Sequence, residues 1–192
     1  MALLIAGLVL FLGIHTLPMQ RSGRAALVSR VGENGYKGLF ALVSFVGLGL
    51  IIFGYGQARL EGPPLLYDPP FWLRHVTMLL MAPVFIFLVA AYVPSRISQA
   101  LKHPMLVAVK LWALSHLLAN GDLASFLLFG GFFVWAVADR ISLKKRGPGA
   151  GQIAAARDPG RFSDVVVILL GLVLYGLFVW KLHAWLIGVP VT

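Results

Sequence analysis

The sequence contains no cysteine among its 192 residues. This absence excludes disulfide bonds, thiolate metal sites, cysteine nucleophiles and the covalent attachment of c-type haem. Acidic residues are also scarce, with seven Asp and Glu against sixteen Lys and Arg, and only 12% of the chain is charged. Soluble domains carry about 25% charged residues, so most of this chain is not expected to face water.

The residues that are abundant indicate an integral membrane protein. Hydrophobic residues make up 59% of the chain, and its mean hydropathy is +0.88. At a rise of about 1.5 Å per residue, apolar stretches of roughly 16 to 23 residues match a hydrocarbon core about 30 Å thick. The predicted fold class is all-α, a polytopic bundle of six transmembrane helices in a single domain over residues 1–192. The predicted spans are about 2–18, 38–57, 71–93, 105–120, 123–139 and 165–187.

Two span boundaries need separate arguments. The fourth and fifth spans meet at Asn120-Gly121-Asp122, a turn signal between apolar runs, which predicts a helical hairpin. The first stretch has the position of a signal peptide, but it lacks a basic N-terminal region, and residues 15–18 make a poor cleavage site. We therefore interpret residues 2–18 as a span. No GxxxG occurs within a span, so helix packing is expected to depend on scattered small residues such as Gly47, Gly49, Gly130 and Gly131.

Basic residues are concentrated in alternate loops, and positive loops stay on the cytoplasmic side of a membrane. This pattern predicts that both termini lie outside. The net charge of +9 is then mainly a topology signal, so we expect the lipid bilayer, and no nucleic acid, as a partner. The inner loop over about 140–164 is expected to be mobile, with its basic cluster near anionic headgroups. Twelve of the sixteen basic residues lie in the inner loops: Arg21, Arg24, Arg30, Lys37, Arg96, Lys102, Arg140, Lys144, Lys145, Arg146, Arg157 and Arg161.

The segment HPMLVAVKLWALSHLLANGD, residues 103–122, places many polar groups in an apolar helix. At 100° per residue, Trp112, His116 and Asn120 share one face, bordered by alanines that leave room for a bulky group. Lys110 lies nearer the inner end, where its ammonium can reach the interface or meet an anion. Ionisable groups within a span are costly, about 2.5–3.5 kcal/mol for a central Lys, and so favour a functional role. The structural alternative is that His116 donates to a neighbouring helix and Asn120 caps the hairpin.

A second intramembrane histidine, His15, lies on the first span. Two imidazoles on separate helices, without cysteine and with few carboxylates, suit haem better than zinc. A structural zinc site wants four protein ligands, whereas haem needs only one or two axial ones. The other three histidines are weaker ligand candidates. His103 precedes a proline at a helix start and is expected outside that helix, and His75 and His183 lie near the outer interface.

Three motifs carry a resemblance to a known family: GIHTLP around His15, the segment around His116 quoted above, and the closing LHAWLIGVPV. Together they resemble the NnrU family of bacterial membrane proteins over essentially the whole chain. That family is similar in turn to the plant and cyanobacterial 15-cis-zeta-carotene isomerases. The resemblance implies a bacterial inner-membrane protein associated with denitrification, linked to the expression or activity of nitrite and nitric oxide reductases.

The resemblance also implies a cofactor. The isomerase branch carries haem b with histidine ligands, and the motifs match these ligands to His15 and His116. Trp112, Asn120 and Lys110 are further cofactor-binding candidates, and Lys110, Arg21 and Arg24 lie on the inner side, where haem propionates would want cations. The isomerase has a possible alternative ligand, a cysteine, three residues before its second histidine. Here that residue is Ala113, a departure that argues against ligand switching and isomerase activity.

Membrane depth leaves the pairing of histidines open. Counted at about 1.5 Å per residue, His15 lies roughly 20 Å from the outer face, while His116, His75 and His183 lie roughly 6 Å from it. Depth alone pairs His116 with His75 or His183, whereas the family pattern favours His15. Helix tilts of about 20° close part of the gap.

Three functions from different classes follow from these observations. The first is a haem-binding accessory protein that works with membrane respiratory or denitrification proteins. The second is an enzyme, either a haem-dependent cis-trans isomerase of a polyene such as zeta-carotene or a small-molecule methyltransferase. The third is a cofactor-free scaffold or transporter subunit. The residues identify no catalytic group, so enzyme activity stays open, and the first function is ranked first.

Overall fold

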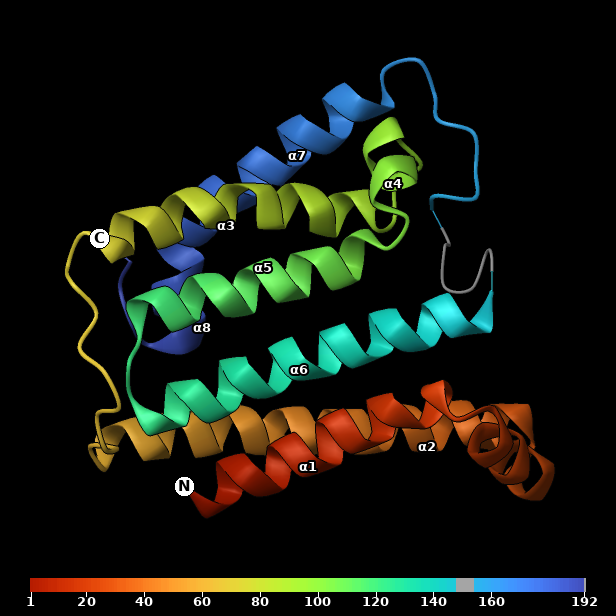
Figure 1. Ribbon diagram of the computed structural model, residues 1–192, viewed down its shortest axis with the longest axis horizontal. Coiled ribbons are helices and arrows are strands. Elements are labelled where there is room, and N and C mark those ends of the chain that lie inside the picture. The colour runs from red at the N-terminus through yellow and green to blue at the C-terminus, as the bar shows by residue number, and fades with distance from the viewer. Residues whose placement is uncertain (148–153, 192) are drawn as a thin grey trace. The chain divides into compact units, whose positions relative to one another are not determined.

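The computed structural model describes residues 1–147 and 154–191, and these residues form mainly helices (Figure 1). No β-strand occurs in these two ranges, where the only extended pairing is an isolated bridge between Leu65 and Asp122. The chain divides into two compact units. Unit 1 comprises residues 1–68 and 120–142, and unit 2 comprises residues 69–119 and 143 to the C-terminus. The elements are α1 (Ala2–Thr16), η1 (Leu17–Met19), α2 (Arg21–Leu60), α3 (Leu73–Ala90), α4 (Arg96–Leu101), α5 (Pro104–Ala119), α6 (Leu123–Arg146), α7 (Ser163–Leu177), η2 (Phe178–Leu182) and α8 (His183–Ile187).

Five helical segments in the described residues are long and apolar enough to cross a bilayer: Ala2–Met19, Arg21–Leu60, Leu73–Ala90, Leu123–Arg146 and Ser163–Ile187. These match five of the six predicted spans and fit an integral membrane protein. The remaining predicted span, 105–120, corresponds to α5, which has 16 residues. A helix of that length is about 24 Å long, less than the hydrocarbon thickness, so the count of six spans stays a prediction.

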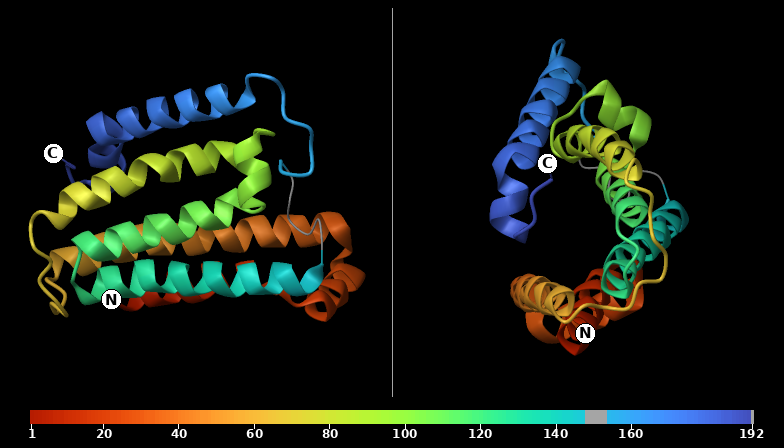
Figure 2. Two further views of the ribbon diagram at one scale, coloured as in Figure 1. Left: turned by 45° about the horizontal axis from the view of Figure 1, so that its top comes forward. Right: turned by 90° about the vertical axis from the view of Figure 1, so that its left-hand side faces the viewer.

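In unit 1, α1 and α2 run antiparallel and in close contact (Figures 1 and 2). Glycines allow the backbones to approach. A Cβ atom on Gly54 would lie 2.3 Å from the Leu4 nitrogen, and one on Gly47 would lie 2.8 Å from the Phe11 nitrogen. A Cβ atom on Gly7 of α1 would likewise lie 2.6 Å from the Ile51 nitrogen of α2. This seam fixes the register of the two helices and places the C-terminal end of α1 against α2.

Helix α2 contains a break that the sequence prediction missed. Gly32 has φ 74° and ψ 167°, so the 40 residues of α2 form two helices joined at a kink. The part before Gly32 is helical, although we predicted a basic loop between the first two spans. Glu33, just past the kink, accepts hydrogen bonds from Arg24 at 2.9 and 3.1 Å, and the Arg24 guanidinium lies 5.1 Å from the centre of the Tyr36 ring. These contacts stabilise the kink at the basic end of unit 1.

The start of α6 is also fixed within unit 1. Asp122 caps the helix, because its carboxylate accepts the Ser125 N–H at 2.9 Å and the Ser125 hydroxyl at 2.6 Å. The Tyr55 hydroxyl lies 2.9 Å from the same Ser125 oxygen. The extended segment before α3 adds a further tie, since the Leu66 N–H donates to the Gly121 carbonyl at 2.8 Å. The predicted Asn-Gly-Asp turn is therefore present and well hydrogen-bonded.

Unit 2 is organised around α3, which packs against both α5 and α7. The Thr77 hydroxyl donates to the Ser115 carbonyl at 2.7 Å, and the Tyr175 hydroxyl donates to the Met78 carbonyl at 2.8 Å. Further along, a Cβ atom on Gly171 would lie 2.6 Å from the Ile86 Cα, which shows a second close backbone approach. Thr77 and Met78, which are adjacent on α3, therefore connect this helix to α5 and α7, respectively.

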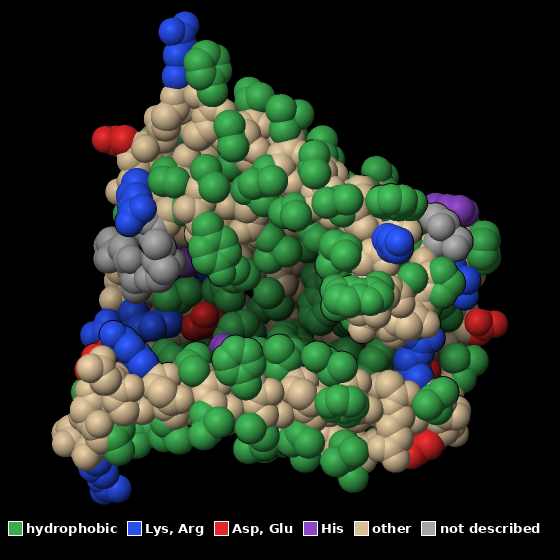
Figure 3. Space-filling model, turned by 180° about the vertical axis from the view of Figure 1, so that it is seen from behind, with side chains coloured by type: hydrophobic (Ala, Val, Ile, Leu, Met, Phe, Trp, Pro, Cys, Tyr) green, Lys and Arg blue, Asp and Glu red, His purple; other side chains and the backbone are tan. Residues whose placement is uncertain are grey.

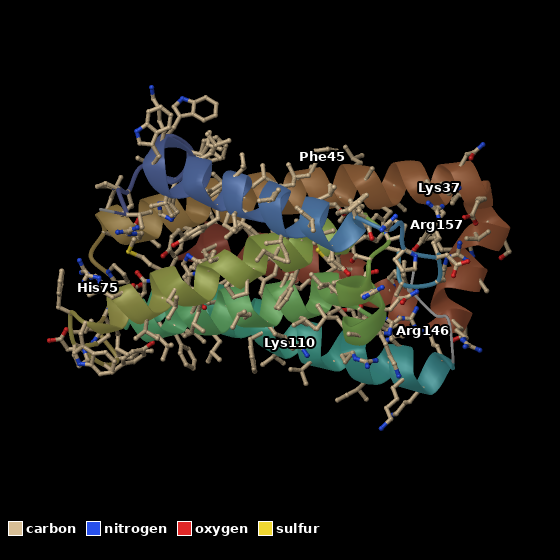
Figure 4. All side chains as sticks on the ribbon, turned by 90° about the horizontal axis from the view of Figure 1, so that it is seen from above. Lys37, Phe45, His75, Lys110, Arg146 and Arg157 are labelled. Atoms are coloured by element: carbon tan, nitrogen blue, oxygen red, sulfur yellow. The ribbon has the colours of Figure 1, made fainter. Side chains whose placement is uncertain are left out.

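One end of unit 2 is basic. The short helix α4 begins with a capping box between Ser95 and Ser98, and the Ile97 N–H donates to the Asp164 carboxylate at 3.2 Å. Figure 4 shows Arg146 and Arg157 at this end and His75 at the opposite end of α3. Helix α6 continues to Arg146, beyond the predicted end at 139, because Leu, Lys and Arg are good helix formers and basic residues stabilise a helix C-terminus. The centre of the loop predicted to be mobile, residues 148–153, lies outside the described residues.

Large apolar side chains cover the outside of both units, as the face in Figure 3 shows. Phe45 and Phe53 on α2 are 74% and 76% exposed, and Trp180 and Trp185 near the C-terminus are 77% and 75% exposed. Such a surface is stable only against lipid, with tryptophans typical of the interfacial belt. The exposed faces therefore support the membrane location.

Candidate functional site

His15 lies in a cage of aromatic rings built from three helices of unit 1. Its imidazole stacks on Phe11 of the same helix, with ring centres 4.1 Å apart. Phe40 of α2 meets the imidazole edge-on at 4.9 Å, and Trp135 of α6 does so at 5.9 Å. The seam between α1 and α2 produces this arrangement, because Phe11 packs at Gly47 and His15 follows one turn later.

The cage holds His15 in one tautomer. Its Nδ1 lies 2.7 Å from the Phe11 carbonyl oxygen, and since a carbonyl only accepts, Nδ1 carries the proton. The lone pair is then on Nε2, which has no hydrogen-bond partner within the described residues. Histidines that bind metals are commonly oriented in this way, by donating the other ring N–H to a backbone carbonyl. His15 therefore presents a nitrogen suited to an axial ligand.

Trp135 adds a polar group that the sequence prediction did not include. Its indole Nε1 is buried and has no hydrogen-bond partner in the described part of the chain. Leaving such a donor unpaired costs about 1–3 kcal/mol, so buried N–H groups in proteins nearly always have an acceptor. The unpaired donor lies on the ring that contacts His15, which suits a site that receives a group with its own acceptor atoms.

His116 lies in unit 2 on α5 and shows the same ring orientation. Its Nδ1 is 2.9 Å from the Trp112 carbonyl oxygen, one turn earlier, and the two rings are in contact with centres 5.4 Å apart. Trp112 and His116 therefore share one helical face, as predicted, and their rings are in contact. Ala113, the position at which the isomerases carry a cysteine, is completely buried and offers no ligand atom.

His183, at the start of α8, is the second histidine of unit 2 whose ring is held by a carbonyl. Its Nδ1 lies 2.7 Å from the Val189 carbonyl oxygen, and Phe178 meets the ring edge-on at 6.2 Å. His183 lies close enough to His116 for the charges of the two imidazoles to interact. The preceding η2 is a single π-helical turn, a feature frequent at functional sites. His183 therefore lies near His116, and this agrees with the similar membrane depth predicted for the two histidines.

Lys110 and Asn120, the other two predicted cofactor-binding residues, lie on or beside α5. Lys110 is half-buried on α5 and forms no ion pair within the described residues. Asn120 lies one residue beyond the end of α5, where its carbonyl accepts the Tyr67 hydroxyl at 2.8 Å. Burial and the charge of Asp122 raise the pKa of Tyr67 above its ordinary value, which keeps this hydroxyl a donor.

The other two histidines differ in character. His75 is exposed near the start of α3, and its ring meets Phe71 edge-on at 5.5 Å. His103 is buried, and its carbonyl accepts the N–H groups of Leu106 and Val107 at 3.1 and 3.2 Å, immediately before Pro104 opens α5. His103 therefore lies just outside the helix that Pro104 opens, as expected.

The donor set fits a group that needs few ligands from the protein. No cluster of three or more His, Cys, Asp or Glu occurs in residues 1–147 and 154–191. The histidines are instead dispersed, and His15, His116 and His183 each have Nδ1 within hydrogen-bond distance of a backbone carbonyl oxygen. A porphyrin supplies four nitrogens of its own, so single imidazoles suffice. His15 belongs to unit 1 and His116 to unit 2, so the predicted His15–His116 pair stays a prediction.

Phe11, Phe40 and Trp135 are the site residues that the sequence prediction missed. Phe11 had a usable signal, since it lies four residues before His15 and on the same helical face. Phe40 and Trp135 lie 25 and 120 residues from His15 in the sequence, and only the packing of α2 and α6 against α1 brings them to it.

Comparison with known proteins gives one match. The family described as NnrU protein matches residues 3–191, nearly the entire chain. Neither the curated proteins nor the solved structures gave a match.

Proposed function

Because this chain belongs to the NnrU family, we propose that it binds haem b within the membrane and acts as an accessory protein in nitrite and nitric oxide reduction. Family membership fits a denitrification-associated membrane protein. The observation that carries the haem proposal is the environment of His15, where Nδ1 is held by the Phe11 carbonyl and a buried indole donor lies unpaired against the ring. A bound haem would supply a one-electron redox centre.

His15 and His116 are the residues that would hold the haem iron. The carbonyls of Phe11 and Trp112 fix the two rings, and Trp112 packs beside the second one. His183 is the alternative partner of His116, because the two imidazoles lie near enough within unit 2 for their charges to interact. Lys110, Arg21 and Arg24 are the cations proposed to neutralise propionates.

The proposed topology has six spans in the bacterial inner membrane, with both termini outside. Alternation of basic loops supports it. The short α5 decides the outcome, because five spans would place the termini on opposite sides. Reporter fusions after residues 68, 121 and 191 test this proposal: all three are expected outside, and a cytoplasmic signal at any one of them contradicts it.

The haem proposal is tested on the protein purified in detergent after expression with added haem. We expect a Soret band that shifts on reduction and that is lost or strongly weakened in His15→Ala and His116→Ala. His75→Ala is the matched control, since this histidine is exposed and is expected to leave the spectrum unchanged. A His183→Ala variant that loses the band while His15→Ala retains it would assign the pair within unit 2. A colourless wild type contradicts haem binding altogether.

The cellular role needs a separate test. We expect a deletion strain to reduce nitrite or nitric oxide more slowly, and the His116→Ala gene to fail to restore the rate when the wild-type gene does. Normal denitrification in the deletion strain, together with conversion of di-cis zeta-carotene by the protein in a carotenoid-producing host, would favour the isomerase function instead.

A further inference from the structure

The indole N–H of Trp135 is a buried donor for which unit 1 supplies no acceptor. Trp135 lies in the middle of α6, and its ring stands at 88° to the imidazole of His15. The imidazole cannot accept through Nδ1, which is bound to Phe11. Two polar atoms of neighbouring rings, Nε1 of Trp135 and Nε2 of His15, are thus without partners in the described residues.

A purely structural role would not require a tryptophan here. Phenylalanine fills similar apolar space and has no donor to bury, and phenylalanines already form the rest of the cage. Within the hydrocarbon region, acyl chains offer no acceptor to such a donor. The acceptor for this donor is therefore provided neither by the described residues of unit 1 nor by the acyl chains.

We propose that the Trp135 N–H donates a hydrogen bond to a carboxylate oxygen of the group bound at His15, and that a haem propionate is this carboxylate. This inference rests on the proposed function and identifies Trp135 as a positioning residue for the haem. A carboxylate is the strongest acceptor that haem carries, and the bond to it is charge-assisted.

The test compares the binding of two ligands to haem-free protein in detergent. One is haemin, and the other is haemin dimethyl ester, in which neutral methyl esters replace both carboxylates. Each is titrated into the wild type, Trp135→Phe and Trp180→Phe. Trp180 is a matched control because it is an exposed tryptophan of η2 in the other unit. We expect the wild type and Trp180→Phe to prefer haemin over the ester, and Trp135→Phe to lose about fivefold of that preference.

The melting temperature of the haem-free proteins is the second readout. Trp135→Phe is expected to melt at the wild-type temperature or slightly higher, because it removes an unpaired buried donor and keeps an aromatic ring. An unchanged preference in Trp135→Phe overturns the inference, and the donor then binds water or lipid. A drop in melting temperature without a change in preference shows a packing role and also overturns it. If the wild type binds neither ligand, the proposed function itself fails.

Discussion

The imidazole of His15 stacks on the ring of Phe11, one turn earlier on α1, with the ring centres 4.1 Å apart and an angle of 27° between the planes. The same Phe11 supplies the carbonyl that holds Nδ1. One residue therefore controls both the rotation of the imidazole and its tautomer, and the orientation of Nε2 depends on it.

Shortening Phe11 should weaken haem binding while the backbone carbonyl remains. We expect Phe11→Ala to lower the affinity for haemin about tenfold or more, the range typical when the support of a metal ligand is removed. Titration followed at the Soret band measures the loss. Phe45→Ala is the control, because Phe45 lies on α2 but faces outward (Figure 4). Equal losses in the two variants would show that the effect does not come from the contact with His15.

Gly54 should tolerate no side chain, whereas Gly56 should. A Cβ on Gly54 would clash with the backbone of Leu4, while one on Gly56 meets nothing within 4 Å. We expect Gly54→Ala to lower the free energy of unfolding by about 1–3 kcal/mol and Gly56→Ala to leave it unchanged or raise it by up to about 1 kcal/mol through helix propensity. Thermal unfolding in detergent gives the comparison. A Gly54→Ala protein as stable as Gly56→Ala contradicts the seam between α1 and α2.

Removing the cap of α6 should destabilise the Asn-Gly-Asp turn. Asp122 accepts two hydrogen bonds from Ser125, so Asp122→Ala is expected to cost about 1–2 kcal/mol of stability. Asp122→Asn keeps an acceptor oxygen and is expected to lose much less. Denaturation curves of the two variants separate capping from charge, and similar losses in both would assign the effect to the charge of Asp122.

The hydrogen bond from Tyr67 to Asn120 should depend on pH only in the alkaline range. Burial, followed by the charge of Asp122, raises the pKa of Tyr67, so the folded protein binds this proton more tightly than the unfolded chain does. The resulting stabilisation is complete below the unfolded pKa of about 10 and is lost as pH rises through the folded value. The difference in melting temperature between wild type and Tyr67→Phe should therefore be constant near neutral pH and shrink above about pH 10. A difference that already changes between about pH 6 and pH 8 would point to another titrating group.

Much of the fold could be predicted because helix length and helical periodicity are local properties. Five of the predicted spans coincide with long apolar helices, and the hairpin turn lies at Asn120-Gly121-Asp122. Trp112 and His116 share a helical face, as their spacing of four residues predicted. The helix before Gly32 was missed because its glycines, serines and arginines resemble a polar loop. Gly47 was correctly expected in a helix contact. Gly131 was also correctly expected there, since its Cβ would meet the Leu12 side chain of α1 at 3.5 Å. The expectation for Gly49 and Gly130 was wrong, because a Cβ on either would have no described atom within 4 Å.

The sequence by itself determined an apolar helical chain with basic loops, histidines within or beside its spans, and the ring-to-carbonyl spacing that fixes His15 and His116 within their own helices. Only the tertiary structure decided that Gly54 carries the close contact with α1 and that Phe40 and Trp135 complete the surroundings of His15. The physical reason is that a helix sets the directions of its own side chains, whereas the choice of partner depends on where two backbones can approach most closely. That choice sums many weak contacts between residues distant in the sequence, which no single segment encodes.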